Sequence, residues 1–262
     1  MIIVVCIKQV PEIADVKIDP NTKPLIREGV PTILNPFDEF AIEEALRIKE
    51  KQGGEIIVVS MGPSQAKQAI LKCLAMGADR AIHLTDSLFA GADTLATAST
   101  LSKTIRKFVP KFDIILCGKQ AIDGDTGQVP LEISELLGIP RISGITKLEI
   151  EDRKVVAHRE IDEGYEVLES KLPVLLTALK GLNEPRLPNI RGILSAKKKE
   201  IKIVTASDLD SNTNQFGLTG SPTQVVKIHT PEPRAGGIII HEDDPKIAVN
   251  KLVQFLKKER IL

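Results

Sequence analysis

The sequence predicts an α/β protein with a doubly wound, mostly parallel sheet, and three observations lead to that fold class. Short apolar runs rich in β-branched residues recur along the first two-thirds of the chain, as in strands buried on both faces. Segments with apolar residues at helical spacing lie between these runs, so that strands and helices alternate as in βαβ units. Helix-starting and helix-ending residues, such as Asn35-Pro36 and Gly53-Gly54, fall where one pattern gives way to the next.

The predicted elements follow in a regular order. Buried strands are expected at residues 2–7, 55–60, 81–84, 112–117 and 172–179. Helices are expected at residues 36–52, at residues 64–76 with Ser64 as the N-cap, at residues 93–108 with Asp93 as the N-cap, and after the loop 118–128 up to Gly138. Residues 146–170 interrupt this order with three short strands and two turns, which predicts a small antiparallel insertion.

The last part of the chain has a different composition. Residues 180–199 are rich in loop-forming residues, and residues 208–237, rich in Gly, Pro, Ser, Thr and Asn, are long enough for an extended arm. A final helix is expected from Pro245 to Lys258. We therefore expect an α/β domain at 1–205 and a C-terminal arm with its helix at 206–262. Such an arm needs a surface to lie against, because alone it buries too little apolar area to offset its chain entropy.

Composition excludes several function classes. Lys plus Arg equals Asp plus Glu, 35 each, and the chain has one Tyr and no Trp, so no nucleic-acid partner is expected. No apolar run approaches the ~20 residues of a membrane helix, and the N-terminal run lacks the basic start of a signal peptide. A cytoplasmic protein without membrane insertion is therefore expected. Neither the cysteines nor the histidines have metal-ligand spacing, so we expect buried reduced thiols and no metal. These residues are Cys6, Cys73, Cys117, His83, His158, His229 and His241.

Four predicted loops carry residues suited to ligand binding, because ligands of open parallel sheets bind at the carboxyl ends of the strands. They are residues 6–11, 35–38, 61–64 and 118–128. The last leaves a buried strand, enters a helix and combines glycines and carboxylates with Thr126 and Gln128. Helix N-termini bind phosphate and glycine lets the backbone approach it closely, so this loop predicts a nucleotide site; a solvated loop with capping residues is the alternative.

Other motifs add less. The helix start at residues 91–97 is a second possible anion site or simply a capped helix. The chain lacks both G-x-G-x-x-G and the Walker sequence, and it has no recognisable Ser/His/Asp arrangement, so no catalytic residue is assigned.

Several long motifs resemble the β subunit of electron-transferring flavoproteins. They are CIKQVP, NPFDEFAIEEAL, VVSMGP, AMGADR, GKQAIDGDTGQ, VAHREIDEGYEVLESKLPVLLT and NEPRLPNIRGILSAKKKEI, in order over essentially the whole chain. The resemblance implies a heterodimer whose α subunit holds one FAD and is wrapped by the C-terminal arm. It also implies a pocket in this chain for AMP or a second FAD, in which backbone groups hold the adenine and a helix start at Thr126 faces the phosphate. By motif match the pocket residues are Cys6, Asn35, Pro36, Phe37, Asp38, Met61, Gly118, Lys119, Gln120, Ala121, Ile122, Asp123, Gly124, Asp125, Thr126, Gly127 and Gln128.

The family has two branches. Carriers bind structural AMP and pass electrons from acyl-CoA dehydrogenases to a quinone reductase. Bifurcating members bind FAD, accept a hydride from NADH, and divide its electrons between a high-potential acceptor (acyl-CoA dehydrogenase or quinone oxidoreductase) and a low-potential one, ferredoxin. The small Gly124, residues 91–98 (GADTLATA) and residues 220–225 (GSPTQV) resemble the bifurcating branch, whereas LNEPR and AKKKEI resemble carriers. The resemblance therefore implies FAD and NAD(H), with AMP as the alternative. The further flavin contacts would be Gly91, Ala92, Asp93, Thr94, Thr97, Gly220, Ser221, Pro222, Thr223 and Val225.

Residues 183–199 resemble the partner-recognition loop of the family. Leu187 or Ile190 would anchor a redox partner, and loop length favours Ile190; an ordinary exposed apolar residue is the alternative. Lys197, Lys198 and Lys199 would steer an acidic partner or are simply solvated. Two other classes stay open: an ATP-hydrolysing or adenylating protein of the same fold, and an AMP-filled scaffold that only docks partners.

Overall fold

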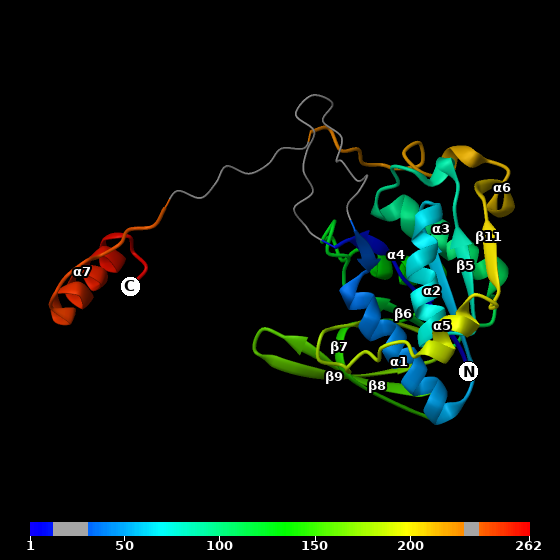
Figure 1. Cartoon of the computed structure of the whole chain (residues 1–262), viewed down its shortest axis with the longest axis horizontal. Helices are drawn as coiled ribbons and strands as arrows, with labels where there is room; N and C mark the ends of the chain where they lie inside the picture. The colour runs from blue at the N-terminus through cyan, green and yellow to red at the C-terminus, as the bar shows by residue number, and fades with distance from the viewer. Residues whose placement is uncertain (13–30, 228–235) are drawn as a thin grey trace. The chain divides into compact units, whose positions relative to one another are not determined.

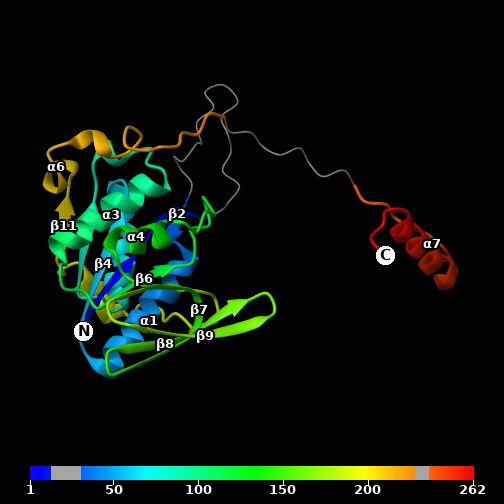
Figure 2. The same cartoon turned by 180° about the vertical axis from the view of Figure 1, so that it is seen from behind.

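The computed structural model describes residues 1–12, 31–227 and 236–262, which fall into two compact units, Met1–Val226 and Lys227–Leu262 (Figures 1 and 2). In the first unit the main sheet has the strand order β11-β5-β4-β1-β6-β10-β7-β8-β9. The strands from β11 to β7 run parallel, and β8 and β9 are antiparallel. The chain moves outward from β1 to β5 and then returns to β6 on the other side. This arrangement confirms the doubly wound sheet and puts a topological switch point between β1 and β6.

The bounds of β1, β4, β5, β6 and β10 match the predicted runs to within two residues, whereas β7 begins five residues before the predicted strand and β2, β3 and β11 were not predicted. The parallel strands are β1 (Ile2–Cys6), β4 (Glu55–Met61), β5 (Arg80–Leu84), β6 (Ile114–Gly118), β10 (Val174–Ala178), β11 (Ile201–Val204) and the first part of β7 (Arg141–Glu151). The predicted antiparallel insertion is present as the rest of β7 with β8 (Lys154–Ile161) and β9 (Gly164–Lys171), and it continues the same sheet. A separate antiparallel pair is formed by β2 (Gln9–Pro11) and β3 (Thr32–Leu34).

Helices cover both faces of the sheet (Figure 1). One face packs on α1 (Pro36–Gln52), α2 (Lys67–Met76) and α5 (Ile190–Ala196), and the other on α3 (Thr94–Phe108), α4 (Val129–Leu137) and α6 (Ala206–Leu209). Along β1, Ile3 and Val5 face the first layer while Val4 faces the second, and all three are fully buried. Each such side chain contributes about 1.5–3 kcal/mol, which explains why the parallel strands are continuous apolar runs.

Several predicted helix boundaries are confirmed. Asp93 caps α3 by accepting from Ala96 N at 2.9 Å, and Gly77 and Gly138 follow the last residues of α2 and α4. The predicted cap at Ser64 is wrong: the 3₁₀ turn η1 (Ser64–Ala66) precedes α2, its cap position is Pro63, and no side chain caps it. Short 3₁₀ turns also occur at η2 (Ser87–Phe89) and η3 (Thr213–Gln215).

The second unit contains α7 (Pro245–Lys258), with the bounds that the sequence predicts. Asp244 caps it by accepting from Lys246 N at 2.9 Å. All residues of α7 are described and none is buried, although its apolar residues Val249, Leu252 and Leu256 are spaced for one helix face. None of the helices in the described ranges combines the length and apolar character that crossing a membrane requires.

Candidate functional site

The candidate site lies at the switch point between β1 and β6. These strands are neighbours in parallel register, with Cys6 opposite Cys117, so the loops that follow them leave the same edge of the sheet. The first loop leads toward β2, and the second is the predicted ligand loop, residues 118–128. Loops that diverge from neighbouring strands leave a crevice between them, and this is where ligands of doubly wound sheets bind.

A buried carboxylate joins the two loops to the start of α1. Asp38, 5% exposed, accepts through Oδ2 from Lys8 N at 2.7 Å. Its Oδ1 accepts from Gly118 N at 3.1 Å and from Asn35 Nδ2 at 2.9 Å. Gly118 is required here, because a Cβ at this position would lie 2.3 Å from Asp38 Oδ1. The N-P-F-D sequence therefore supplies both the helix start and the group that holds the crevice together.

Asn35 holds the next part of the ligand loop. Its Nδ2 donates to Gln120 O at 2.9 Å, and its Oδ1 accepts from Ile122 N at 3.2 Å. Asn35 is 1% exposed, and its side chain does not cap α1, because it is engaged with the loop. We call Asn35, Asp38 and residues 118–122 the junction.

Burial governs the charge of the junction. Removal of Asp38 from water raises the pKa of its carboxyl to about 7, although hydrogen bonds from Asn35, Lys8 N and Gly118 N act in the opposite direction. Every one of these contacts is a donor, so the ionised carboxylate matches its surroundings geometrically while burial opposes the charge.

The outer part of the loop is tightly turned. Asp125 and Gly127 have φ values of 54° and 61°, and the Asp125 side chain accepts from Gln120 Nε2. Lys8 Nζ, from the loop after β1, forms an ion pair with Asp123 Oδ1 at 2.7 Å, which links the two loops. The helix start that the resemblance places at Thr126 is wrong: α4 begins at Val129, because the positive φ values at 125 and 127 are incompatible with a right-handed helix.

A second wall is formed where the start of α3 meets residues 217–225. Asp93 Oδ2 accepts from Thr223 N at 3.0 Å and from Thr223 Oγ1 at 2.8 Å. Ser221 Oγ accepts from Asp93 N at 2.8 Å and donates to Gly217 O at 2.7 Å. Partial burial opposes ionisation of Asp93, but the hydrogen bonds from Ala96 N and Thr223 lower its pKa. We call Asp93, Ser221 and Thr223 the latch.

The start of α3 also meets the ligand loop. The Thr94 hydroxyl lies 3.1 Å from Gln128 Oε1 and 3.0 Å from Glu132 Oε1. Glu132 Oε2 is buried and has no hydrogen-bond partner among the described residues, and burial raises the pKa of this carboxyl. Glu132 is not among the residues predicted from the sequence to bind a ligand; its position four residues after Gln128, on the same helical face, is the pattern that points to it.

The structure thus brings together three segments that were singled out separately in the sequence. Residues 118–128 form the ligand loop, residues 91–97 begin α3, and residues 220–223 lie against that helix start through the latch. Val225, by contrast, is 79% exposed, and Met61 ends β4, where it packs against the core under α3. Cys6, Cys73 and Cys117 are buried free thiols, as expected.

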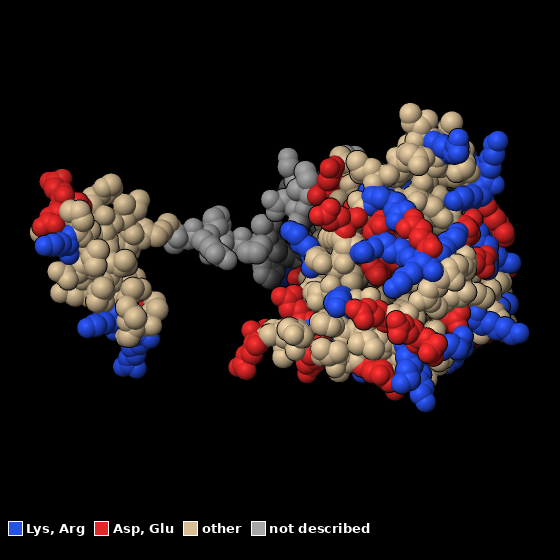
Figure 3. Space-filling view, turned by 90° about the horizontal axis from the view of Figure 1, so that it is seen from below, with Lys and Arg blue, Asp and Glu red and all other residues tan. Residues whose placement is uncertain are grey.

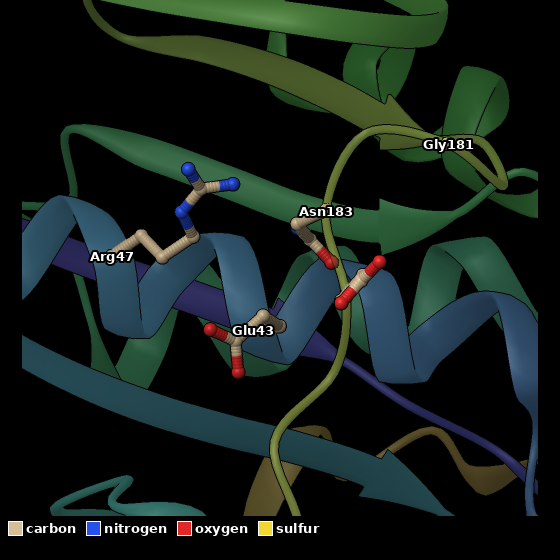
Figure 4. Close-up of a pocket in the computed structure, with 5 residues that line it drawn as sticks. Glu43, Arg47, Gly181 and Asn183 are labelled. Atoms are coloured by element: carbon tan, nitrogen blue, oxygen red, sulfur yellow. The ribbon is translucent and has the colours of Figure 1, made fainter.

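A separate cavity of about 500 Å³ lies between α1 and the segment after β10 (Figure 4). Glu43 and Arg47 line it from α1, and Gly181, Asn183 and Glu184 line it from the other side. It is not part of the crevice at the switch point. Among the described residues no group of His, Cys, Asp and Glu is placed to hold a metal ion; His229 lies outside the described residues.

The predicted recognition loop, residues 183–199, presents its two candidate anchors to solvent. Leu187 is 87% exposed, and Ile190, the first residue of α5, is 79% exposed. Lys199 has an internal role, since its amine donates to Leu74 O at 3.0 Å and to Ala78 O at 2.5 Å, at the end of α2. Lys197 and Lys198 are the members of the basic run without such a contact among the described residues. Basic and acidic side chains are interspersed on the face of the first unit that Figure 3 shows.

Comparisons with known proteins agree with the resemblance. The sequence model of the electron transfer flavoprotein domain matches residues 23–209. The chain is 54% identical over 263 residues, 100% of both chains, to the electron transfer flavoprotein subunit beta of Thermoanaerobacterium thermosaccharolyticum. It is 46% identical over its full length to subunit CarD of the caffeyl-CoA reductase-Etf complex of Acetobacterium woodii, which is also covered in full. To the protein FixA of Azotobacter vinelandii it is 43% identical, over 93% of this chain and 90% of that one.

Proposed function

The chain belongs to the electron transfer flavoprotein family as a β subunit, and on that premise we propose that it binds FAD at the switch point and serves NADH-dependent electron bifurcation. The observation that carries this proposal is the meeting of the ligand loop, the start of α3 and residues 220–223. AMP needs only the junction and the ligand loop. A ligand as long as FAD also needs the second wall.

The residues present fit a flavin dinucleotide. α3 is 15 residues long, and its dipole and the N–H groups of Thr94 and Leu95, which Asp93 does not cap, favour a phosphate. The buried Glu132 Oε2, which has no hydrogen-bond partner in the described part of the chain, belongs to the carboxyl group beside Thr94 and provides an acceptor for a ligand hydroxyl or N–H. Among the described residues no atom lies within 4 Å of the Cβ position of Gly124, so the described part of the chain leaves space there.

The side chains would hold and orient the cofactor. A bound flavin supplies hydride acceptance and one-electron transfer, and the protein supplies position, exclusion of water and electrostatics. The junction would hold the adenine end through backbone groups of residues 118–122, and Thr94 and the latch would line the phosphate end. No catalytic residue is assigned to the chain.

The partners follow from the same proposal. The FAD-holding α subunit would be covered by the C-terminal unit, because α7 has no buried residue of its own and would pack its apolar face on that subunit. Leu187 and Ile190 would contact an acyl-CoA dehydrogenase or a quinone oxidoreductase, and ferredoxin would accept the low-potential electron. The relative from A. woodii belongs to a complex with a caffeyl-CoA reductase, which supports a dehydrogenase-type partner. We place the complex in the cytoplasm.

The first experiment is to co-purify the chain with its α subunit, denature the complex and quantify the released FAD and AMP. Two FAD and no AMP per heterodimer are expected. One FAD and one AMP would overturn bifurcation and support the second candidate, a carrier with structural AMP, which the LNEPR and AKKKEI sequences favour.

A variant tests the location of the site. Gly124→Glu places a bulky anion in the open part of the ligand loop, so this heterodimer is expected to lose the FAD of the β site and keep that of the α subunit. Retention of both flavins would contradict the assignment of this loop to the cofactor.

A further inference from the structure

We propose that Arg186 is a positioning residue that fixes the recognition loop on α1, so that Leu187 and Ile190 are held ready before a redox partner arrives. The inference rests on the proposed function in one respect, namely that this loop docks a redox partner. The positioning itself is argued from contacts within the chain.

Arg186 is attached to α1 by both its side chain and its backbone. Its Nε and Nη2 each donate to a different oxygen of Glu43 at 2.9 Å, a bidentate pair, and its backbone N donates to Glu43 Oε2 at 3.1 Å. Glu43 is 4% exposed, and the outer edge of the guanidinium also pairs with the exposed Glu50. A planar guanidinium that satisfies a buried carboxylate in this way defines one orientation of the chain.

The ends of the loop are held as well. At its beginning, Asn183 Nδ2 donates to Phe40 O at 3.0 Å and to Glu44 Oε2 at 2.9 Å, both on α1. At its end, α5 lies against α2 so closely that a Cβ on Gly192 would be 2.2 Å from Ala75 O. The exposed residues from Leu187 to Ile190 therefore lie between two fixed points.

On the side that faces α1, the recognition loop is held by the hydrogen bonds of Asn183 and Arg186. The cavity of about 500 Å³ lies on this side, lined by Glu43 and Arg47 of α1 and by Gly181, Asn183 and Glu184 (Figure 4). Leu187 and Ile190 are too exposed to hold themselves in place by packing. Loss of the Arg186 pair would thus let the loop sample other arrangements, and the partner would have to order it on binding.

The test uses the complete heterodimer with Arg186→Gln, Arg186→Lys and Glu43→Gln, and with Glu50→Gln as the matched control that removes only the outer, exposed contact. One readout is the rate of trypsin cleavage after Arg191, a site that all variants keep. The other is the Michaelis constant and turnover number for electron transfer with a purified short-chain acyl-CoA dehydrogenase. FAD content and melting temperature show whether each variant is folded.

Arg186→Gln and Glu43→Gln are expected to speed cleavage by about tenfold, because cleavage needs local opening of the loop. They should raise the Michaelis constant roughly tenfold at unchanged turnover number and FAD content, since only docking is affected. Arg186→Lys should fall between these variants and the wild type, because an ammonium cannot replace the bidentate pair. Glu50→Gln should match the wild type.

The positioning role is overturned if a folded Arg186→Gln protein is cleaved at the wild-type rate, or if Glu50→Gln has as large an effect as Glu43→Gln. A Leu187→Ala/Ile190→Ala variant separates the two proposals. An unchanged Michaelis constant in that variant would overturn docking by this loop, while the cleavage rates would still decide the positioning role.

Discussion

The junction and the latch are two walls of one candidate site, yet they are built in opposite ways. The two side chains at the centre of the junction are buried, Asn35 being 1% and Asp38 5% exposed. The latch is close to solvent. Its hydrogen bonds join Asp93 to Ser221 and to Thr223, which are separated from it by 128 and 130 positions in the chain. Loss of one partner in a buried network leaves unsatisfied groups, whereas exposed groups can bond to water instead. The junction is therefore a requirement of the fold, and the latch is an addition that a longer ligand can use.

The largest expected effect comes from removing the centre of the junction. Asp38→Ala leaves Lys8 N and Gly118 N without their acceptor and removes one of the two acceptors of Asn35 Nδ2, at a cost on the order of 5 kcal/mol. Urea unfolding should show this loss, and both AMP and FAD should be absent from the β site. Glu39 follows Asp38 on the same turn of α1, and its partly exposed carboxylate pairs with Lys72 of α2. Glu39→Ala, which removes this pair, should cost less than about 1 kcal/mol. Equal losses in the free energy of unfolding for Asp38→Ala and Glu39→Ala would contradict the view that the fold requires the junction.

A second prediction concerns the pH dependence of the junction. The folded-state pKa of Asp38, about 7, lies above its ordinary value of 3.8, so the folded protein holds this proton more tightly than the unfolded chain. The resulting stabilisation is fully present below about pH 4 and is lost as the pH rises to about 7, with roughly 4 kcal/mol as its upper limit.

A carbon-13 NMR titration of the Asp38 carboxyl should therefore have its midpoint near pH 7. Asp210 is a control in the same spectra, because a hydrogen bond from Asn212 N and contacts with Gln215 and Lys103 lower its pKa to about 2. An Asp38 midpoint below its ordinary value of 3.8 would show that the donors around this carboxylate outweigh its burial.

Removal of the latch should have a smaller and more selective effect. Asp93→Ala deletes the cap of α3 and both bonds to Thr223, together about 2 kcal/mol, which corresponds to roughly thirtyfold in affinity. Calorimetric titration of the β site should show weaker FAD binding with AMP affinity unchanged. Asp93→Asn keeps a capping oxygen and should retain part of the affinity. If AMP binding falls as much as FAD binding, the latch is not selective for the longer ligand.

The smallest effect is expected at the tip of the ligand loop. Gly124→Ala adds a methyl group that meets no atom of residues 1–12, 31–227 or 236–262 within 4 Å, so the free energy of unfolding should lie within about 0.5 kcal/mol of the wild type. Gly118→Ala, at the base of the same loop, should destabilise the junction because its methyl group would collide with Asp38 Oδ1. Melting temperatures of the two variants test this contrast. Similar losses at both positions would mean that the tip is as constrained as the base.

The candidate site could be predicted from the sequence to the extent that its parts are local. Loop 118–128 follows a buried strand and precedes a helix, and the Asp93 cap lies next to the residues that it caps, so both could be located from neighbouring residues alone. The helix start at Thr126 could not be placed correctly, because the positive φ at Asp125 depends on how the loop closes. The contacts of Asp38 with Lys8 and Gly118 also required the fold, because they span 30 and 80 positions.

By itself, the sequence determined the doubly wound sheet, the antiparallel insertion, most helix ends and the bounds of α7. Each of these depends on periodicity or capping within a few residues, which the order of amino acids states directly. Only the tertiary structure decided that β11 pairs with β5, that α5 docks on α2, and that the latch and the Arg186 pair exist. Each of these features joins residues far apart in the chain. The segments involved are short or polar, so they take up a defined position only when the rest of the fold provides a surface for them to contact.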